Sequence, residues 1–369
     1  MKAISEEMNT SSFIFQDFTF DRQSGALSLT YKTGDYLFEE VITFPNAPFT
    51  LKETQEKALE NAFQLLHTLA GVSYYKAFVP ELIQMSEQVR GLNAQQTAFF
   101  DEVYTHGLGE FATRNELDIL DRIHFTAQDA HQPTPEEYDL TQRRLVLVGG
   151  GKDSLVSVQS LQGRKEDITL FAVNPAQPIL NCIEKSGLAS LIVKRALDPQ
   201  LFELNASGKV YNGHVPITAI ISAIATCAAL LYDYDEIILS NERSANEATL
   251  IVEGKEINHQ YSKSFDFEKN LNDYIQRFVH EMLSYYSLLR SLSEAHIARL
   301  FSRSTHYDDV FTSCNGAYKI HKDKIDGRWC GACPKCQFVY LMFATSMPKE
   351  RLNNIVGANP LDQETFLDD

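Results

Sequence analysis

The pattern of apolar and polar residues changes character twice along the chain. Between residues 12 and 45 apolar and polar positions alternate or nearly alternate, and this period of two predicts β-strands joined by short turns. Over residues 50–140 apolar residues recur every three or four positions, which predicts helices, the first with Gly71 as its C-cap. A polar stretch with two prolines at 126–142 then predicts a linker.

After this linker short apolar strands alternate with helical segments. Such alternation predicts an α/β fold, a parallel sheet with helices on both faces. Pro216 is expected to open an apolar helix over 217–232, and a second long helix is expected over 268–292. The expected strands cover residues 143–148, 168–174, 189–197, 236–240 and 309–313.

The chain of 369 residues is long enough for two or three domains. The changes of pattern suggest a small β module, a helical region, an α/β domain that includes the cysteines, and a tail. The corresponding residues are 1–48, 49–140, 141–345 and 346–369.

Charge and hydropathy narrow the classes of partner. The formal net charge is −16, which argues against nucleic acid or an anionic membrane as a partner, because both require a dense basic surface. The N-terminal residues lack the apolar core of a signal peptide, and the segment 217–232 is short for a membrane span. We therefore expect a cytoplasmic protein that acts on a small molecule; its oligomeric state does not follow from the sequence.

Three glycines follow the first strand of the α/β region. Gly149, Gly150 and Gly151 come just before a predicted helix that begins near Asp153. Glycines let the backbone approach an anion, and a helix N-terminus supplies unpaired N–H groups and partial positive charge. The loop is therefore predicted to hold a phosphate, with a tight turn that binds no ligand as the alternative.

Other polar loops are placed beside strand ends. In open α/β sheets, ligands gather at the carboxyl ends of strands, so these loops are candidate binding residues, with turn chemistry and helix capping as the alternative. One loop runs through Asn212, Gly213 and His214, before the apolar helix. The other follows the strand at 236–240 and contains Asn241, Glu242, Arg243 and Ser244.

Four of the six cysteines lie within residues 314–336. Cys314, Cys330, Cys333 and Cys336 offer four thiolates, the set that tetrahedral Zn²⁺ takes in structural sites. An iron–sulfur cluster is the alternative, because a C-x2-C-x2-C run also opens ferredoxin motifs. We favour zinc in a structural role.

The Gly-Gly-x-Asp-Ser string at 150–154 resembles the PP-loop of the ATP pyrophosphatase superfamily, with Gly149 in place of the usual serine. The resemblance implies that ATP, with Mg²⁺, is split between its α and β phosphates. It implies that Gly150, Gly151 and Ser154 hold pyrophosphate, assisted by Lys152. It further implies that Val173 and Asn174 lie against the adenine and that Asp153 helps to organise Mg²⁺.

A longer set of strings resembles the UDP-N-acetylmuramoyl-L-alanyl-L-glutamate epimerase family. They include "GVSYYKAF", "HGLGEFATRN", "NGHVPITAI", "SNERSAN" and "WCGACPKCQFVYL", in this order between about residues 14 and 345. The resemblance implies ATP-dependent inversion of the terminal L-Glu of UDP-MurNAc-L-Ala-L-Glu through a carboxyl-adenylate, with release of AMP and pyrophosphate, in peptidoglycan synthesis. The catalytic candidates are Lys152, Asp153, His214 and Arg243.

Several points stay open from the sequence. The proton-transfer base is not identified, because His214, His259, Lys255 and Tyr261 all lie in or near candidate loops. One alternative function is a PP-loop ligase or amidating enzyme, because the cysteine cluster also resembles that of 7-cyano-7-deazaguanine synthase. A second alternative is a zinc-stabilised nucleotide sensor that binds ATP without turnover.

Overall fold

A computed structural model describes residues 10–128, 134–135, 137–247, 250–252, 255–318, 325, 327–357 and 359–360. The contacts between residues divide the chain into two compact units, each made of three segments. Unit 1 comprises Met1–Gln142, Val193–Ile237 and Ala245–Tyr286, and unit 2 comprises Arg143–Ile192, Ile238–Ser244 and Ser287–Asp369. The domain boundaries predicted above stay a prediction.

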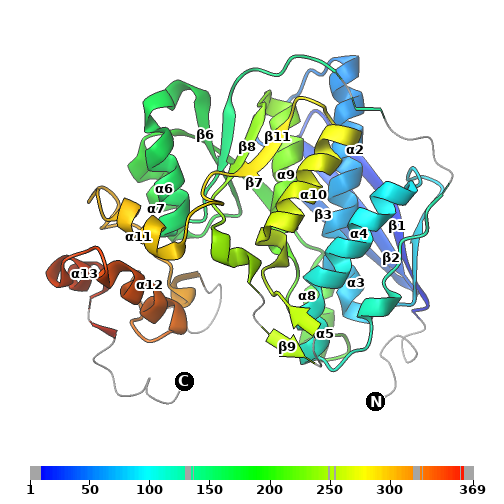
Figure 1. The fold of residues 1–369 in the computed structure, drawn as a ribbon. Coiled ribbons are helices and arrows are strands. Elements are labelled where there is room, and N and C mark those ends of the chain that lie inside the picture. The colour runs from blue at the N-terminus through cyan, green and yellow to red at the C-terminus, as the bar shows by residue number, and fades with distance from the viewer. Residues whose placement is uncertain are drawn as a thin grey trace. The chain divides into compact units, whose positions relative to one another are not determined.

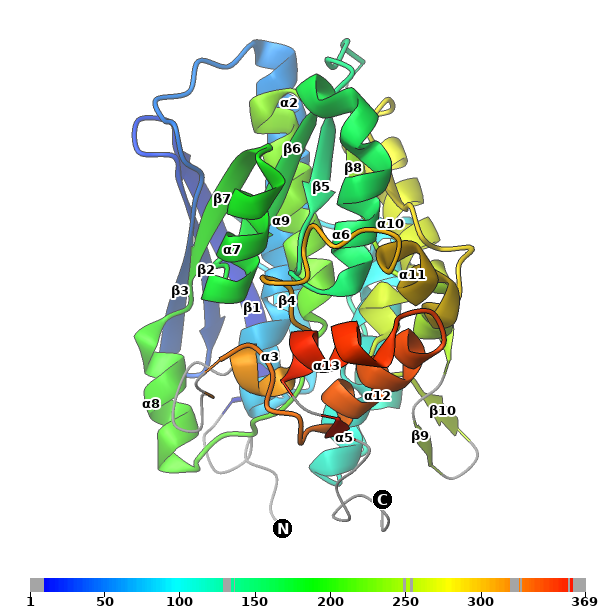
Figure 2. The same cartoon turned by 90° about the vertical axis from the view of Figure 1, so that its left-hand side faces the viewer.

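The N-terminal strands of unit 1 form where the period of two predicts them. Strands β1 (Ser12–Asp21), β2 (Ala26–Thr33) and β3 (Tyr36–Thr43) pair antiparallel (Figure 2). Buried and less buried residues alternate along β2, as expected for a sheet with one face in the core. β4 (Leu82–Met85) pairs with β1 in parallel, and β7 (Ala189–Ala196) pairs with β3 antiparallel. The N-terminal strands therefore belong to a larger sheet.

A buried ion pair fastens β3 to β7. The Arg195 Nε and Glu40 Oε1 atoms are 2.7 Å apart, and a second guanidinium nitrogen lies 3.1 Å from the other carboxylate oxygen. The same guanidinium also donates to the Ser73 hydroxyl, at 3.1 Å. Burial is the largest single influence and would lower the pKa of Arg195, but Glu40, together with Tyr74 and Tyr31, raises it overall. Such a bidentate pair fixes the register of two strands that are far apart in the sequence.

Among the helices of unit 1, α2 (Glu53–Ala70) and α9 (Ile217–Tyr232) pack against each other, as Figure 1 shows. Pro216 is the N-cap of α9, as predicted. Gly71 follows α2 as predicted, but its φ of −55° is helical. A Cβ atom at Gly71 would lie 2.4 Å from the Phe15 ring, so the glycine permits close packing here.

The other helices of the unit are α3 (Val72–Phe78), α4 (Ala94–Gly107), α5 (Gly109–Arg114), α8 (Pro199–Ser207) and α10 (Phe265–Phe278).

Shorter elements complete unit 1. They are the 3₁₀ turns η1 (Leu120–Arg122) and η4 (Tyr261–Lys263), η3 (Arg243–Asn246) at the boundary with unit 2, and the hairpin strands β9 (Leu250–Val252) and β10 (Lys255–Ile257).

Unit 2 contains the predicted strand–glycine–helix element. β5 (Arg144–Leu147) and β6 (Ile168–Val173) pair in parallel. The order of hydrogen-bonded strands is β11-β8-β5-β6-β7-β3-β2-β1-β4, so β5 has β6 on one side and β8 (Glu236–Leu239) on the other. The chain moves from β5 to β6 and β7 and only later reaches β8, which makes the end of β5 a topological switch point. Ligands bind at such points in open α/β sheets.

The remaining elements of unit 2 are mostly helical. They are α6 (Lys152–Leu161), η2 (Gln162–Asp167), α7 (Gln177–Ser186), α11 (Glu294–Phe301), η5 (Asn315–Tyr318), α12 (Pro334–Ala344) and α13 (Lys349–Val356).

Two sequence predictions in the last third of the chain were wrong. The helix predicted over 268–292 is interrupted, because α10 ends at Phe278 and β11 (Ser284–Ser287) follows it. The apolar residues of α10 recur every three or four positions, and the apolar residues of β11 continue this spacing. A strand of four residues is too short for its own alternation to be recognised in the sequence. The strand predicted over 309–313 is also wrong, since these residues form a turn and irregular backbone.

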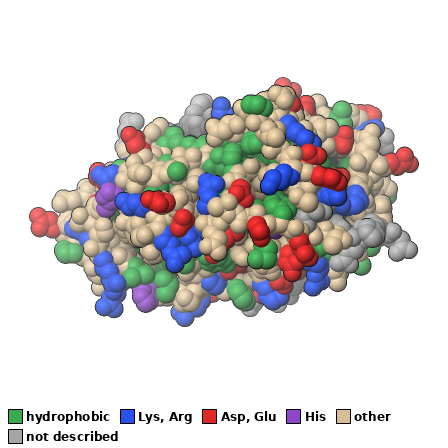
Figure 3. Space-filling view, turned by 90° about the horizontal axis from the view of Figure 1, so that it is seen from above, with side chains coloured by type: hydrophobic (Ala, Val, Ile, Leu, Met, Phe, Trp, Pro, Cys, Tyr) green, Lys and Arg blue, Asp and Glu red, His purple; other side chains and the backbone are tan. Residues whose placement is uncertain are grey.

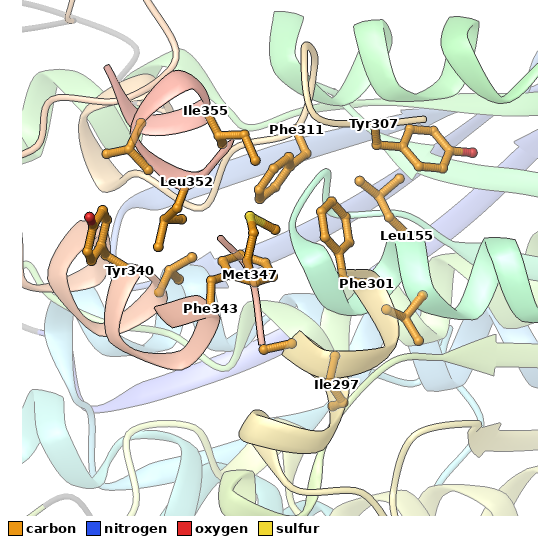
Figure 4. Close-up of a cluster of buried hydrophobic side chains, with 14 of the residues drawn as sticks. Leu155, Ile297, Phe301, Tyr307, Phe311, Tyr340, Phe343, Met347, Leu352 and Ile355 are labelled. Atoms are coloured by element: carbon orange, nitrogen blue, oxygen red, sulfur yellow. The ribbon is translucent and has the colours of Figure 1, made fainter. Parts of the chain in front are cut away.

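The C-terminal helices share a core with α6. Leu155 of α6, Ile297 and Phe301 of α11, and Phe343 of α12 are buried together, as Figure 4 shows. The rings of Phe301 and Phe343 lie 5.3 Å apart, and edge contacts with Phe311 extend the cluster. Burial of this kind contributes about 1.5–3 kcal/mol for each large apolar side chain. The helix that follows the glycines is thus supported by the end of the chain.

No helix in the described parts of the chain has the length and apolarity to cross a membrane. The face drawn in Figure 3 carries basic and acidic side chains interspersed.

Candidate active site

The glycine loop connects β5 to α6 and has the conformation of a β–loop–helix element. Gly150 has φ +75°, in the left-handed region, and Gly151 is the N-cap of α6. A Cβ at Gly150 would lie 2.9 Å from the Tyr318 hydroxyl, and one at Gly151 would lie 3.2 Å from the Ser313 hydroxyl. A Cβ at Gly149 would meet nothing within 4 Å. Space and backbone conformation therefore require glycine at 150, whereas position 149 has room for a side chain.

Lys152, the first residue of α6, is a buried cation held by two carboxylates. Its side chain is 1% exposed, and Nζ lies 2.5 Å from Asp153 Oδ1 and also contacts Glu294 Oε2. Burial alone would lower the pKa of Lys152, but the two carboxylates outweigh burial and raise it. Burial raises the pKa of Glu294, against the opposing effect of Lys152. The Lys152 ammonium is therefore already paired with two carboxylates of unit 2.

Glu294 is a site residue that the sequence did not reveal. It is the first residue of α11, directly after the N-cap Ser293, whose hydroxyl accepts from the amide of His296. The Ser-Glu pair is the available sequence signal, since serine caps helices and acidic residues favour their first turn. The long helix predicted over 268–292 obscures this signal, because it ends directly before Ser293.

The predicted loop after β8 also lies in unit 2, near this triad. The Ser240 hydroxyl is 2.8 Å from that of Ser157 on α6, and Glu242 adds to the raised pKa of Glu294. The amide of Arg243 donates to Leu292 O at 3.0 Å, directly before α11. The remaining contacts of this loop are Arg290 to Glu242 O, Ser287 to Asn241 O, and Ser244 to the Glu242 carboxylate. The structure therefore brings Asn241, Glu242, Arg243 and Ser244 to the same part of unit 2 as Lys152.

Three more residues that the sequence predicts to contact the nucleotide, Ser154, Val173 and Asn174, also lie in unit 2. The Ser154 hydroxyl, buried in the first turn of α6, donates to Gly151 O at 3.1 Å. Val173 is the last residue of β6, and Asn174 follows it with φ +43°, a conformation that asparagine tolerates better than most residues.

His214 lies in unit 1, in a polar cluster of its own. Its ring centroid is 6.3 Å from that of His259, and burial is the main cause of a lowered pKa, with Glu110 opposing it. Beside it, Asn212 Oδ1 lies 3.1 Å from Lys76 Nζ and accepts from the amide of Gly213. The Tyr261 hydroxyl donates to Glu102, at 2.7 Å.

The four predicted cysteines converge in unit 2. Their Sγ atoms all lie within 4.8 Å of one another, with separations of 4.0 Å for Cys314–Cys333, 3.8 Å for Cys330–Cys336 and 3.4 Å for Cys333–Cys336. A tetrahedral ion with Zn–S bonds of about 2.3 Å requires sulfurs about 3.8 Å apart, so the set fits a metal such as zinc. The amides of Cys330 and Ala332 donate to the sulfurs of Cys314 and Cys330, as expected around thiolates.

Known proteins resemble the chain along nearly its whole length. Residues 4–288 match the family model of the MurL N-terminal domain, and residues 310–369 match that of the MurL C-terminal domain. A protein of Xanthomonas oryzae pv. oryzae named UDP-N-acetyl-alpha-D-muramoyl-L-alanyl-L-glutamate epimerase is 44% identical over 96% of this chain and 78% of its own.

Two relatives of the same name come from other bacteria. That of a Micromonospora species is 42% identical over 96% of this chain and 79% of its own, and that of Salinispora tropica is 40% identical over 95% and 76%. These matches confirm the family suggested by the sequence strings. The chain belongs to the UDP-N-acetyl-alpha-D-muramoyl-L-alanyl-L-glutamate epimerase family.

Proposed function

We propose that this protein inverts the terminal L-Glu of UDP-MurNAc-L-Ala-L-Glu to D-Glu, through a carboxyl-adenylate formed from ATP, with release of AMP and pyrophosphate. The observation that carries the substrate is the name shared by three relatives that are 40–44% identical over nearly the whole chain. The glycine loop at a topological switch point supports the use of a nucleotide.

The chemistry explains why ATP is useful. The Cα proton beside a carboxylate is very weakly acidic, because its removal would leave a dianion. Attack of a carboxylate oxygen on the α-phosphorus expels pyrophosphate and leaves a mixed anhydride. The carbanion formed by deprotonation then delocalises as an enolate, whose charge nearby donors can stabilise. Return of a proton to the opposite face inverts the centre, and water at the acyl carbon releases AMP.

In this proposal the residues of unit 2 bind ATP and its magnesium ion. The amides of Gly150 and Gly151 and the start of α6, near Ser154, would hold the departing pyrophosphate. The carboxylates of Asp153 and Glu294 would attract a cation, so Mg²⁺ would arrive with ATP beside Asp153 and offset the phosphate charge. Lys152 would hold Asp153 and Glu294 in place. The predicted nucleotide contacts are Gly149, Val173, Asn174, Asn241, Glu242 and Ser244, with Arg243 as a carboxylate or phosphate clamp.

Two further assignments complete the proposal. For proton transfer we propose His214, one of the four candidates named from the sequence, because burial lowers its pKa and a neutral imidazole can accept a proton near neutral pH. Zn²⁺ in the four-cysteine cluster would have a structural role, because four thiolates fill its coordination shell.

The test uses the purified protein with ATP, Mg²⁺ and UDP-MurNAc-L-Ala-L-Glu. We expect D-Glu after hydrolysis of the product, together with AMP and pyrophosphate. Ser154→Ala should slow pyrophosphate release, whereas Ser160→Ala, on the same helix with its hydroxyl bonded to Val156 O, is the matched control. Pyrophosphate without inversion would indicate a ligase, and ATP binding without turnover would indicate a sensor.

A further inference from the structure

The carbonyl oxygens of the glycine loop are held by a segment far away in the sequence. The Tyr318 hydroxyl is 3.1 Å from Gly149 O and 3.0 Å from Thr312 O. The amide of Thr312 donates to Gly150 O at 3.4 Å, and the Cys182 thiol lies 3.7 Å from the same oxygen. Two successive peptide carbonyls of the loop therefore face residues 312–318.

This arrangement fixes the direction of the amides. In a trans peptide the C=O of one residue and the N–H of the next point to opposite sides. With the carbonyls of Gly149 and Gly150 turned toward Thr312 and Tyr318, the N–H groups of Gly150 and Gly151 point the other way. In the described part of the chain neither N–H has a hydrogen-bond acceptor. Successive free amides next to a helix N-terminus form an anion-binding nest.

Glycines alone do not select this arrangement. A glycine populates both signs of φ at similar cost, so a peptide in a Gly-Gly-Gly run can turn either its carbonyl or its amide toward the ligand side. A carbonyl on that side would repel a phosphate. Contacts from outside the loop therefore decide whether it binds an anion.

The segment that makes these contacts is tied to the cysteine cluster. Cys314 lies between Thr312 and Tyr318, and its amide donates to the Thr312 hydroxyl at 3.0 Å. The same hydroxyl donates to the carbonyl oxygen of Arg328 at 2.6 Å, two residues before Cys330, whose amide donates to the Cys314 sulfur at 3.4 Å. The segments that carry Cys314 and Cys330 are thus both hydrogen-bonded to Thr312, the residue whose amide binds the Gly150 carbonyl.

We infer that residues 312–318, fixed by the four-cysteine centre, position the glycine loop by holding its carbonyls and so turn its amides toward the anion. Tyr318 and Thr312 are positioning residues in this account. The inference rests on the proposed function, in which the loop holds pyrophosphate.

The test is the affinity of the full-length protein for magnesium pyrophosphate, measured by calorimetry. Tyr318→Phe should weaken binding about five- to tenfold, the effect of one net hydrogen bond, with unchanged metal content and melting temperature. Tyr340→Phe is the matched control, because that hydroxyl bonds Asn353 within the same unit, and it should leave the affinity unchanged. Thr312→Val should weaken binding in the same direction by loosening the link to the cysteines.

Metal removal gives an independent readout. Treatment with a chelator should weaken pyrophosphate binding, and restored metal should reverse the loss. Equal affinity of wild type, Tyr318→Phe and Thr312→Val would overturn the inference while leaving the proposed function intact. Failure of the wild-type protein to bind pyrophosphate would overturn the phosphate site itself, and the inference with it.

Discussion

Two buried lysines, one in each unit, differ in the partners of their ammonium groups and in the direction of their pKa shifts. Lys152 is 1% exposed and Lys76 is 5% exposed. Two carboxylates hold the ammonium of Lys152 and raise its pKa. The hydrogen-bond partner of the Lys76 ammonium in the described residues is the neutral amide oxygen of Asn212, and burial lowers its pKa to about 8.

The difference teaches that partners, more than depth, set the consequence of burying a charge. Removing one partner of a buried ion pair lowers the free energy of unfolding by several kcal/mol, because the other ion stays buried without a counter-charge. A buried ion that has no charged partner already destabilises the native protein, so its removal takes that cost away. Removal of the two side chains should therefore change stability in opposite directions.

The largest effect is expected for Lys152→Met. The substitution leaves Asp153 and Glu294 close together without a cation, and we expect it to lower the free energy of unfolding by about 3–5 kcal/mol at pH 7. Lys76→Met, measured beside it by urea unfolding, should be as stable as wild type or more stable. Asn212 Oδ1 would still accept from the amide of Gly213. A larger loss for Lys76→Met than for Lys152→Met would reverse the comparison.

The second effect is a dependence on pH that carries opposite signs at the two sites. Between pH 8 and the ordinary lysine pKa of 10.5, the unfolded chain binds the Lys76 proton and the folded chain does not, so stability is gained as pH rises. Lys76→Met should thus be more stable than wild type by up to about 3 kcal/mol near pH 7, an advantage that shrinks toward pH 10.5. Lys152, with a raised pKa, contributes stability that is fully present below pH 10.5 and is lost above it.

Melting temperatures of wild type and Lys76→Met across pH 7–10.5 provide the measurement, with Lys152→Met as the variant whose difference from wild type should stay constant over this range. A constant difference between wild type and Lys76→Met over this range would show that the Lys76 ammonium titrates normally, and the comparison would fail.

A smaller effect sharpens the account of the triad. In the Lys152→Met background, Glu294→Leu should restore about 1–2 kcal/mol, because it removes one of the two carboxylates left without a cation. In the wild-type background Glu294→Leu should destabilise the protein, since it takes one partner from Lys152. Additive effects in a double-mutant cycle of unfolding free energies would mean that Lys152 and Glu294 do not interact.

The sequence predicts local features better than distant partners. The glycine loop, the N-terminal strands and the four cysteines follow from short-range pattern and spacing, and the structure contains all three. Glu294 could not be paired with Lys152 from the sequence, because 142 residues separate them and no periodicity connects their elements. The same holds for the bond from Tyr318 to Gly149, 169 residues apart. Tertiary pairing of this kind leaves no local signal.

The central claim is that the carboxylate next to the inverted carbon becomes an adenylate. The most direct test supplies substrate with ¹⁸O in both oxygens of that carboxylate and analyses the AMP by mass spectrometry. Attack of a substrate oxygen on phosphorus, followed by water at the acyl carbon, leaves one ¹⁸O in each AMP, and the account predicts this label together with D-Glu. Formation of D-Glu without AMP would contradict the adenylate, and unlabelled AMP would contradict attack of water at the acyl carbon.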